Sequence, residues 1–328
     1  MSVSSTSVVV KMFLRNVVNF VVNKLLIRRE TTFEDMSNEI VLLIFSFLNA
    51  DTLKNACLVC PKWNELIGSS ASTMNKLKLK LDPWTVDKLE ELAVFNRHYN
   101  SVDIFYGNIF DKIVDALNRF NVAQVRTFKI FGPQTVGVEI IKLLSLMPML
   151  EILVFEPFKI DLSIEEFFKV NLPELKSLEI DSVNCDTLRF ISAEKLSRIF
   201  IHGYRIPNTQ DNKSIIDFLT QSEQLKRLDV NYHSFAALFG FEIPVNFNFQ
   251  LTEFKLDLYQ TFLTPAMGEN FKKFLQSQSK LESLVFNLVE NIPQQIFITI
   301  FNDLRNLKQL DVQVSDLPVE LRFYEKIN

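Results

Sequence analysis

Three cysteines are the residues of this chain that could most readily hold a metal. Cys57 and Cys60 form a C-x-x-C pair, which is half of the ligand set of a structural zinc site. The third thiol, Cys185, lies far along the chain and has no second pair beside it. A closed zinc site needs four ligands, so the spacing argues against one. Three thiols also fit no disulfide framework, and they indicate a reducing compartment in which cysteines pack as small core residues.

Catalytic and phosphate-binding motifs are also missing from the sequence. His98, His202 and His233 lie far from one another, and none forms an H-E-x-x-H motif or pairs with a second ligand at metal spacing. Gly132 and Gly137 have the spacing of a phosphate-binding loop, but the lysine and hydroxyl residue that such a loop requires do not follow them. We therefore predict no catalytic residue, no metal site and no cofactor, and we expect that the chain is not an enzyme.

The elements of the chain begin with three short helical patterns between residues 36 and 67. Ser37 can cap the first helix, and Glu39 lies in its first turn, where the helix dipole favours a carboxylate. Asp51 can begin the second helix, and Pro61 fits the first position of the third. Their apolar residues recur at helical spacing and include Ile40, Leu43, Ile44, Phe47, Leu48, Leu53, Trp63, Leu66 and Ile67. So small a unit cannot bury all of them, so it either caps a larger core or binds another protein.

The same stretch resembles an F-box, the motif that docks receptor subunits onto a Skp-type adaptor. The acid, the Ile-Phe pair, the two leucines, the Val-Cys pair and the tryptophan of that motif align without a gap on Glu39, Ile44, Phe45, Leu48, Leu53, Val59, Cys60 and Trp63. Met36 and Ser37 stand in place of the opening Leu-Pro. Serine lacks the fixed backbone angle of proline, so the turn into the first helix is less preorganised. The resemblance implies that these residues, together with Met36, Ser37 and Ile40, bind the adaptor.

The composition is that of a globular protein with a large apolar core. Of 328 residues, 48% are hydrophobic and 23% are charged, which is not typical of a disordered chain. The net charge of −4 provides no global positive field for nucleic acid, so we expect no nucleic-acid partner. Glycine occurs seven times and phenylalanine 31 times. The scarcity of glycine argues against phosphate-cradling loops, and the phenylalanines indicate a thick core.

Residues 1–30 differ from the rest of the chain. Five basic residues precede the first acid, Glu30, and polar residues at four-residue steps share one helix face, which predicts a basic amphipathic leader. Polar residues interrupt its apolar run every few positions, which argues against a membrane span. The alternatives that remain are a poorly ordered leader, a helix that contacts a membrane surface and a mitochondrial presequence.

A repeated eight-residue string begins after a turn-like run of small residues at 69–72 and continues to the end of the chain. Each string has an apolar first, fourth and sixth residue, and the strings start at residues 74, 99, 125, 150, 175, 196, 225, 251, 281 and 307. In the string at 175, Leu178 and Ile180 alternate with the polar Ser177, Glu179 and Asp181, which predicts a short strand. Helical patterns separate the strings at 86–97, 139–147, 213–221, 270–278 and 294–304. One strand and one helix per repeat cannot bury an apolar face alone, so we expect stacked repeats with a parallel sheet.

The strings resemble leucine-rich repeats over residues 74–314. The asparagine or cysteine that usually follows the third apolar residue is replaced by Val183, His233, Tyr259 and Ser315, so the turn after each strand must be satisfied in another way. The resemblance implies an α/β fold, in which a three-helix F-box precedes a solenoid with convex helices. The alternative is an irregular α/β domain with unrelated leucine-rich strands.

The strand face that points away from the core is the expected binding surface, because the concave faces of solenoids bind partners. Candidate substrate-binding residues on it are Phe105, Phe131, Ile152, Val154, Phe200, Arg198 and Arg227. Lys76, Lys78 and Lys80 also fall on this side of the first string. They are typical of a charged edge strand that resists aggregation, and only weakly indicate a nucleic-acid site.

Together these patterns predict a basic leader at 1–30, an F-box at 31–70, a leucine-rich-repeat-like solenoid at 71–314 and a C-terminal tail or cap at 315–328. The resemblance implies the substrate receptor of an SCF-type ubiquitin ligase, which binds a Skp-type adaptor and through it the cullin and RING subunits. An unidentified protein would be the substrate, and the expected location is the cytoplasm, the nucleus or both. The alternative is a protein-binding scaffold without ubiquitin transfer.

Overall fold

The computed structural model describes residues 36–82, 85, 97–105, 113, 117, 122–132, 135–136, 139–155, 159–160, 169–181, 187–203, 209–240, 246–258, 263–288 and 294–314. The predicted leader at 1–30, the predicted tail at 315–328 and nearly all of the helix predicted at 86–97 lie outside these residues.

The described chain begins with a helical unit of α2 (Asn38–Ser46), α3 (Ala50–Cys57), α4 (Pro61–Ser69) and α5 (Ala71–Met74). Asn49 caps α3, because its side chain accepts a hydrogen bond from the Thr52 amide at 2.9 Å, and Pro61 occupies the first position of α4. The three predicted helices are therefore present, and α5 is a short fourth helix that the apolar pattern did not predict. The unit has its own core, made of Val41, Phe45, Leu48, Leu53, Ala56, Trp63, Leu66, Ile67, Met74 and Leu77.

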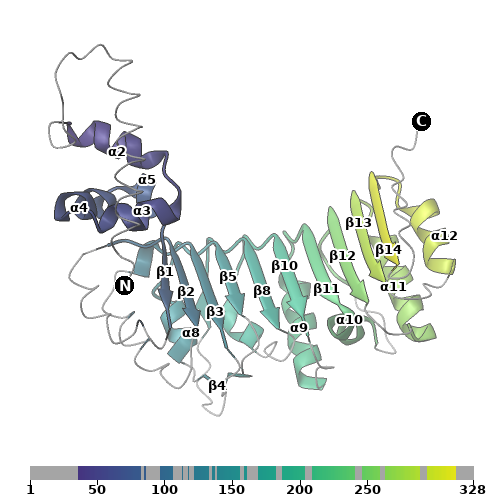
Figure 1. The fold of residues 1–328 in the computed structure, drawn as a ribbon. Coiled ribbons are helices and arrows are strands. Elements are labelled where there is room, and N and C mark those ends of the chain that lie inside the picture. The colour runs from purple at the N-terminus through teal and green to yellow at the C-terminus, as the bar shows by residue number, and fades with distance from the viewer. Residues whose placement is uncertain are drawn as a thin grey trace.

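A ten-stranded parallel sheet follows the helical unit (Figure 1). Its strands are β1 (Lys78–Leu81), β2 (Ser101–Phe105), β3 (Thr127–Phe131), β5 (Ile152–Phe155), β8 (Ser177–Asp181), β10 (Arg198–His202), β11 (Arg227–Asn231), β12 (Glu253–Leu258), β13 (Ser283–Leu288) and β14 (Gln309–Val314). They pair in chain order. The predicted fold class is confirmed: the chain is α/β, with N-terminal helices followed by a parallel sheet, as in an F-box joined to a leucine-rich-repeat-like solenoid.

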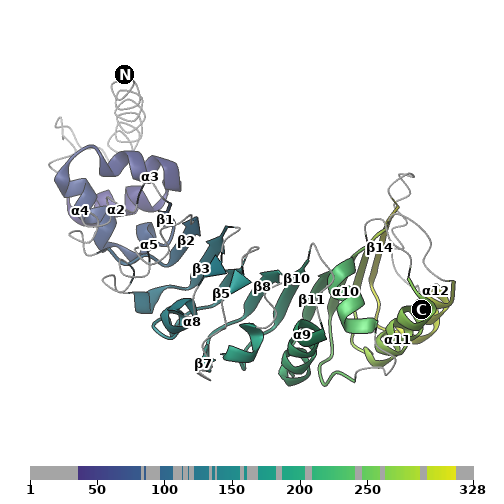
Figure 2. The same ribbon diagram turned by 90° about the horizontal axis from the view of Figure 1, so that it is seen from below.

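Helices cover one face of this sheet and leave the other open, and the sheet is curved (Figures 1 and 2). The covering helices are α8 (Glu139–Leu144), α9 (Thr209–Gln221), α10 (Tyr232–Phe239), α11 (Pro265–Ser277) and α12 (Gln294–Asp303). Shorter elements complete the connections: η3 (Val122–Gln124), β4 (Thr135–Val136) paired with β6 (Lys159–Ile160), and β7 (Val170–Asn171) paired with β9 (Ile191–Ser192). Sequence reasoning missed α10, which begins directly after β11 and leaves no loop to mark it.

In every string after the first, equivalent positions of neighbouring strings pair with each other across the sheet. The fourth and sixth residues of neighbouring strings pair across the sheet, as Leu178 and Ile180 do with Ile199 and Ile201, and they are buried. The first string is displaced by two residues. Leu79, not Leu77, pairs with Val102. The prediction that Lys76 lies on the strand face is therefore wrong, because Leu77 packs in the core of the helical unit and the strand begins after it.

A ladder of backbone carbonyls fixes where each strand begins. The carbonyl oxygen at the second position of a string accepts the N–H groups of the second and third residues of the next string. The Arg126 oxygen, for example, accepts from Glu151 at 2.8 Å and from Ile152 at 2.9 Å. The same pattern runs through Asn100, Arg126, Glu151, Lys176, Ser197, Lys226, Thr252, Glu282 and Lys308. Each step satisfies two backbone donors at once, so a slip of one residue would lose both and turn the apolar side chains outward.

Side-chain amides satisfy backbone groups of neighbouring repeats. Asn231 accepts from the Ser234 amide and so caps α10, and its own amide donates to the Gly203 oxygen at 2.6 Å. Asn270 donates to the Phe239 oxygen at 3.0 Å, and the Gln278 oxygen accepts from the Leu251 amide at 2.8 Å. These bonds connect successive repeats.

Phenylalanine rings fill the space between β11–β13 and the helices that cover them. Phe271 lies at the centre of this group, with its ring centroid between 5.1 and 6.3 Å from the rings of five other phenylalanines. The five are Phe235, Phe239, Phe254, Phe274 and Phe286. Several of these contacts are edge-to-face, the geometry that the charge distribution of aromatic rings favours.

We predict that Phe271→Ala lowers the free energy of unfolding by about 3–5 kcal/mol, because it leaves a cavity among rings that cannot close around it. Urea denaturation of the full chain, followed by circular dichroism, measures this loss. Phe47→Ala is the matched control, since that side chain is 80% exposed and should cost under about 0.5 kcal/mol. Equal losses for the two variants would contradict the assignment of the core.

Candidate protein-binding surfaces

Most of the apolar residues predicted to contact an adaptor lie inside the helical unit. Phe45 and Leu53 are fully buried, and Ile44, Leu48 and Trp63 are each less than a tenth exposed. The ring of Phe45 meets Trp63 edge-on, with 5.2 Å between the ring centroids. These five side chains therefore stabilise the unit itself. Their contact with an adaptor stays a prediction.

The remaining predicted contact residues lie at or near the surface. Val59, Cys60 and Met36 are partly buried, while Ser37, Glu39 and Ile40 are exposed. Ser37 does not cap α2 with its side chain, contrary to expectation. Hydrogen bonding by the Ser37 side chain, and then by the backbone at Glu39, lowers the pKa of the Glu39 carboxyl below its ordinary value.

Four large apolar side chains of the helical unit are exposed. Ile40, Leu43 and Phe47 follow one another along one face of α2 and are 41%, 59% and 80% exposed. Leu58, just after α3, is 82% exposed. Figure 1 places α2 on the side of the unit away from the sheet. The sequence pattern contained Leu43 and Phe47, but it could not separate the inward face of α2 from the outward one, because apolar residues surround the helix.

The helical unit is tied to the start of the sheet by long side chains. The Lys76 ammonium donates to the Leu48 oxygen at 2.9 Å and to the Ser46 oxygen, which are carbonyls at the end of α2. These groups have no partner within the helix, and a cation there is favoured by the helix dipole. Arg97 donates a hydrogen bond to the Asn64 side chain. Burial raises the pKa of the Cys57 thiol, and the positive charge of Arg97 offsets part of this increase.

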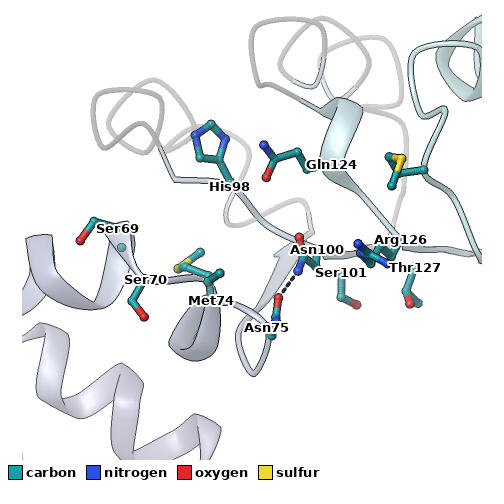
Figure 3. Close-up of a pocket in the computed structure, with 13 residues that line it drawn as sticks. Ser69, Ser70, Met74, Asn75, His98, Asn100, Ser101, Gln124, Arg126 and Thr127 are labelled. Atoms are coloured by element: carbon teal, nitrogen blue, oxygen red, sulfur yellow. Dashed lines mark hydrogen bonds between the residues drawn. The ribbon is translucent and has the colours of Figure 1, made fainter. Parts of the chain in front are cut away.

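A recess lies at this junction and has a volume of about 870 Å³ (Figure 3). Ser69, Ser70 and Asn75 line it from the helical unit, while Gln124 at the end of η3 and Arg126 just before β3 line it from the other side. A hydrogen bond between the side chains of Asn75 and Asn100 crosses from one part to the other. No carboxylate is among its described lining residues. The recess therefore lies between the helical unit and the first strands, and this hydrogen bond joins the two parts across it.

On the open face of the sheet, the predicted apolar candidates are exposed to different degrees. Phe105 and Ile152 are each 39% exposed, and Phe131 is partly buried. The expectation that Val154 is exposed is wrong, because it is 4% exposed. It pairs with Lys129 and Glu179 on the two neighbouring strands, whose long side chains can cover a short branched one.

Phe200, Arg198 and Arg227 lie near the middle of the same face. Arg227 forms a two-pronged pair with Asp229, at 3.1 and 3.0 Å, and bonds Glu253 at 2.9 Å. Its guanidinium also lies 5.3 Å from the centroid of the Phe200 ring. Asp229, then Glu253, raises the pKa of Arg227. Arg227 is therefore held in place by its neighbours, whereas Arg198 is exposed.

Neither metal-ligand clusters nor membrane-spanning helices occur in the described part of the chain. No group of three or more His, Cys, Asp or Glu residues within it could hold a metal ion. No helix among the same residues has both the length and the apolar content to cross a membrane.

Residues 38–78 match the F-box-like family model. The match spans helices α2 to α5 and ends at the first residue of β1. No curated protein matches the chain. Among solved structures, a protein from Bacteroides fragilis is similar with a TM-score of 0.45 and 13% identity, over 74% of each chain. That likeness is too weak to carry an argument. The family match supports an F-box protein, a class whose members are in general adaptors rather than enzymes.

We predict that Lys76→Met lowers the local stability of the helical unit. The substitution keeps most of the apolar stem but removes the donors to the end of α2, and a hydrogen bond from a charged group contributes about 1.5–3 kcal/mol. Hydrogen exchange followed by mass spectrometry should show amides of α2 and α3 exchanging about tenfold faster or more, with β10–β13 unchanged. Lys80→Met, at an exposed position of β1, is the matched control. Unchanged exchange in α2 would contradict the role of Lys76.

Proposed function

We propose that this chain is the substrate-recognition subunit of an SCF-type ubiquitin ligase. In this proposal the helical unit binds a Skp-type adaptor, and through it the cullin and RING subunits, while the open face of the sheet binds a protein substrate. The single observation that carries it is the coincidence of two features in one short segment. Residues 38–78 match the F-box-like family, and the same residues expose large apolar side chains.

The exposed side chains of α2 and Leu58 are the contact that we assign to the adaptor. Phe47 and Leu58 each leave about four-fifths of their surface in water, which is unfavourable for side chains of this size unless a partner covers them. The buried anchors Phe45 and Trp63 then act indirectly, because they hold α2 and α4 in the arrangement that presents the surface. Both groups are required for binding, for different physical reasons.

The replacement of the motif's Leu-Pro by Met36 and Ser37 lowers the affinity for the adaptor less than the sequence suggests. Ser37 has φ −64° and ψ 151°, and this φ is the value that a proline ring would impose. The backbone therefore reaches the motif's shape without proline. The remaining cost is the extra freedom of serine in the unfolded chain, about 0.4–1 kcal/mol. This argument supports adaptor binding despite the unusual start of the motif.

The mechanism in this proposal is proximity, and no residue of the chain takes part in bond formation. A substrate held on the sheet has a high effective concentration of its lysines near the ubiquitin-carrying enzyme. The gain depends on a fixed distance between substrate and adaptor. Lys76 contributes to that distance, because it joins the end of α2 to the residues just before β1. The proposed location is the cytoplasm, the nucleus or both.

We predict that Phe47→Asp and Leu58→Asp each weaken adaptor binding by about 30-fold or more, as expected when an interface anchor worth about 2 kcal/mol is lost. The measurement is titration of the full chain with purified Skp-type adaptor. Ile298→Asp is the matched control, because that residue is exposed to a similar degree as Ile40 but lies on α12, and it should leave the affinity unchanged. Ser37→Pro should bind at least as tightly as the natural chain.

The outcomes of this titration distinguish two roles. Adaptor binding that is abolished by Phe47→Asp, together with recovery of a cullin subunit from cells, supports the ligase role. A natural chain that binds neither adaptor nor cullin would contradict it and would favour a scaffold without ubiquitin transfer. Trp63→Ala is less informative, because its burial predicts that it unfolds the unit.

A further inference from the structure

Three lysines lie together on the open face at the first strands of the sheet. Lys78 and Lys80 are on β1, and Lys129 is on β3. In the register, Lys80 and Lys129 flank Asp103 from the two sides. Protection of an edge strand explains the lysines of β1, which is the first strand of the sheet, but not Lys129, because β3 is paired on both sides. Protection of an edge therefore does not account for Lys129.

The described residues around these lysines offset only part of their positive charge. Asp103 is the carboxylate between Lys80 and Lys129, but it is 6% exposed and its Oδ1 atom has no hydrogen-bond partner. None of the three lysines forms an ion pair with any residue that the structure describes. Lys78 and Lys80 are exposed and Lys129 is partly exposed. The first strands therefore carry three lysines against one buried carboxylate, Asp103, and this leaves an excess of positive charge on their open face.

A preformed aromatic platform lies beside this charge. Phe105 and Phe131 are register partners at the ends of β2 and β3, with parallel rings whose centroids are 4.6 Å apart and whose planes differ by 10°. Phe105 is 39% exposed. Each ring fixes the position of the other, so little side-chain freedom is lost when an apolar group packs on the pair.

The rest of the open face has the opposite charge. Glu179, Asp229, Glu253, Asp257 and Asp311 lie on strands β8 to β14. These five carboxylates outnumber the three bases there: Arg227 is paired with Asp229 and Glu253, Lys255 is paired with Asp257 at 3.2 Å, and Arg198 on β10 is exposed. A negatively charged partner is therefore attracted to β1–β3 and repelled farther along the sheet.

We propose that the β1–β3 end of the open face binds an acidic peptide segment that carries one aromatic or large aliphatic residue. The apolar residue packs on Phe105 and Phe131, and the carboxylates of the segment pair with Lys80 and Lys129. This inference rests on the proposed receptor role and names the class of segment that the receptor takes.

A short acidic peptide fits this surface better than a nucleic acid. A single-stranded nucleic acid carries a negative charge at every nucleotide, so a strand that continued along the face would meet the carboxylates of β8 to β12. A peptide can limit its acidic residues to the few positions that face the lysines. Nucleic-acid binding is therefore an outcome that the test must be able to detect.

Selection from a displayed library of random peptides against the immobilised full chain tests the proposal. The expected result is enrichment of sequences with several Asp or Glu residues next to a Phe, Tyr, Trp, Leu or Ile. The best selected peptide, labelled with a fluorophore, should then bind at least tenfold more weakly to Lys129→Glu and to Phe131→Ala. Lys273→Glu, a matched charge reversal at an exposed position of α11 and therefore outside the open face, should change the affinity less than twofold.

Two further measurements separate charge recognition from loss of structure. Lys129→Met, which removes the charge without adding repulsion, should weaken binding by a smaller factor and reduce its salt dependence, with an unchanged circular dichroism spectrum. Selected peptides that are basic or neutral, the absence of any enriched acidic peptide, unchanged affinity for Lys129→Glu, or tighter binding of a mixed single-stranded oligonucleotide would each overturn the proposal.

The same protein samples are titrated with the Skp-type adaptor. Adaptor binding without acidic-peptide enrichment overturns this inference and leaves the proposed ligase role intact. Acidic-peptide binding that depends on Lys129, without adaptor binding, supports the inference and overturns the ligase role. The two failures are therefore distinguishable.

Discussion

The carbonyl ladder at the strand starts is the constraint on which the rest of the sheet depends. In every step from Asn100 to Lys308, one oxygen satisfies two N–H groups of the next repeat. Backbone donors buried without a partner are costly, so the ladder fixes each strand in register with the last. The spacing between strings can vary from 21 to 30 residues because the register is set at this single point, and the connecting segments absorb the difference in length.

Register then determines the two faces of the solenoid. With the ladder in place, the fourth and sixth residues of each string point toward the helices, where leucines, isoleucines and the phenylalanines around Phe271 make the core. The third and fifth residues point toward the open face. Polar and aromatic side chains there come from strands far apart in sequence, so the charge difference between β1–β3 and β8–β14 belongs to the assembled sheet and to no single repeat.

At the first repeat, side-chain contacts with the helical unit take the place of the carbonyl ladder. Leu77 belongs to the core of the helical unit, and Lys76 closes the carbonyl end of α2. The string at residue 74 therefore contributes Leu77 to the core of the helical unit and Leu79 to the core of the sheet. This explains why its pairing with the next string is displaced by two residues. The same arrangement leaves the outer side of α2 free, with Leu43 and Phe47 in solvent, on the part of the chain that matches the F-box-like family.

The sequence by itself determined the parallel repeat, the inward positions of nine strings and the three main helices, because these depend on local periodicity and on capping residues such as Asn49 and Pro61. It also located the F-box-like segment from the spacing of its motif. Only the tertiary structure decided which apolar residues are buried. Phe45 lies in the last turn of α2 and Phe47 directly follows that helix, yet the first is fully buried and the second is 80% exposed, since the neighbouring helices cover one side of α2. The burial of Val154 could not be predicted for the same reason, because burial on a sheet face depends on side chains from neighbouring strands that lie about 25 residues away in sequence.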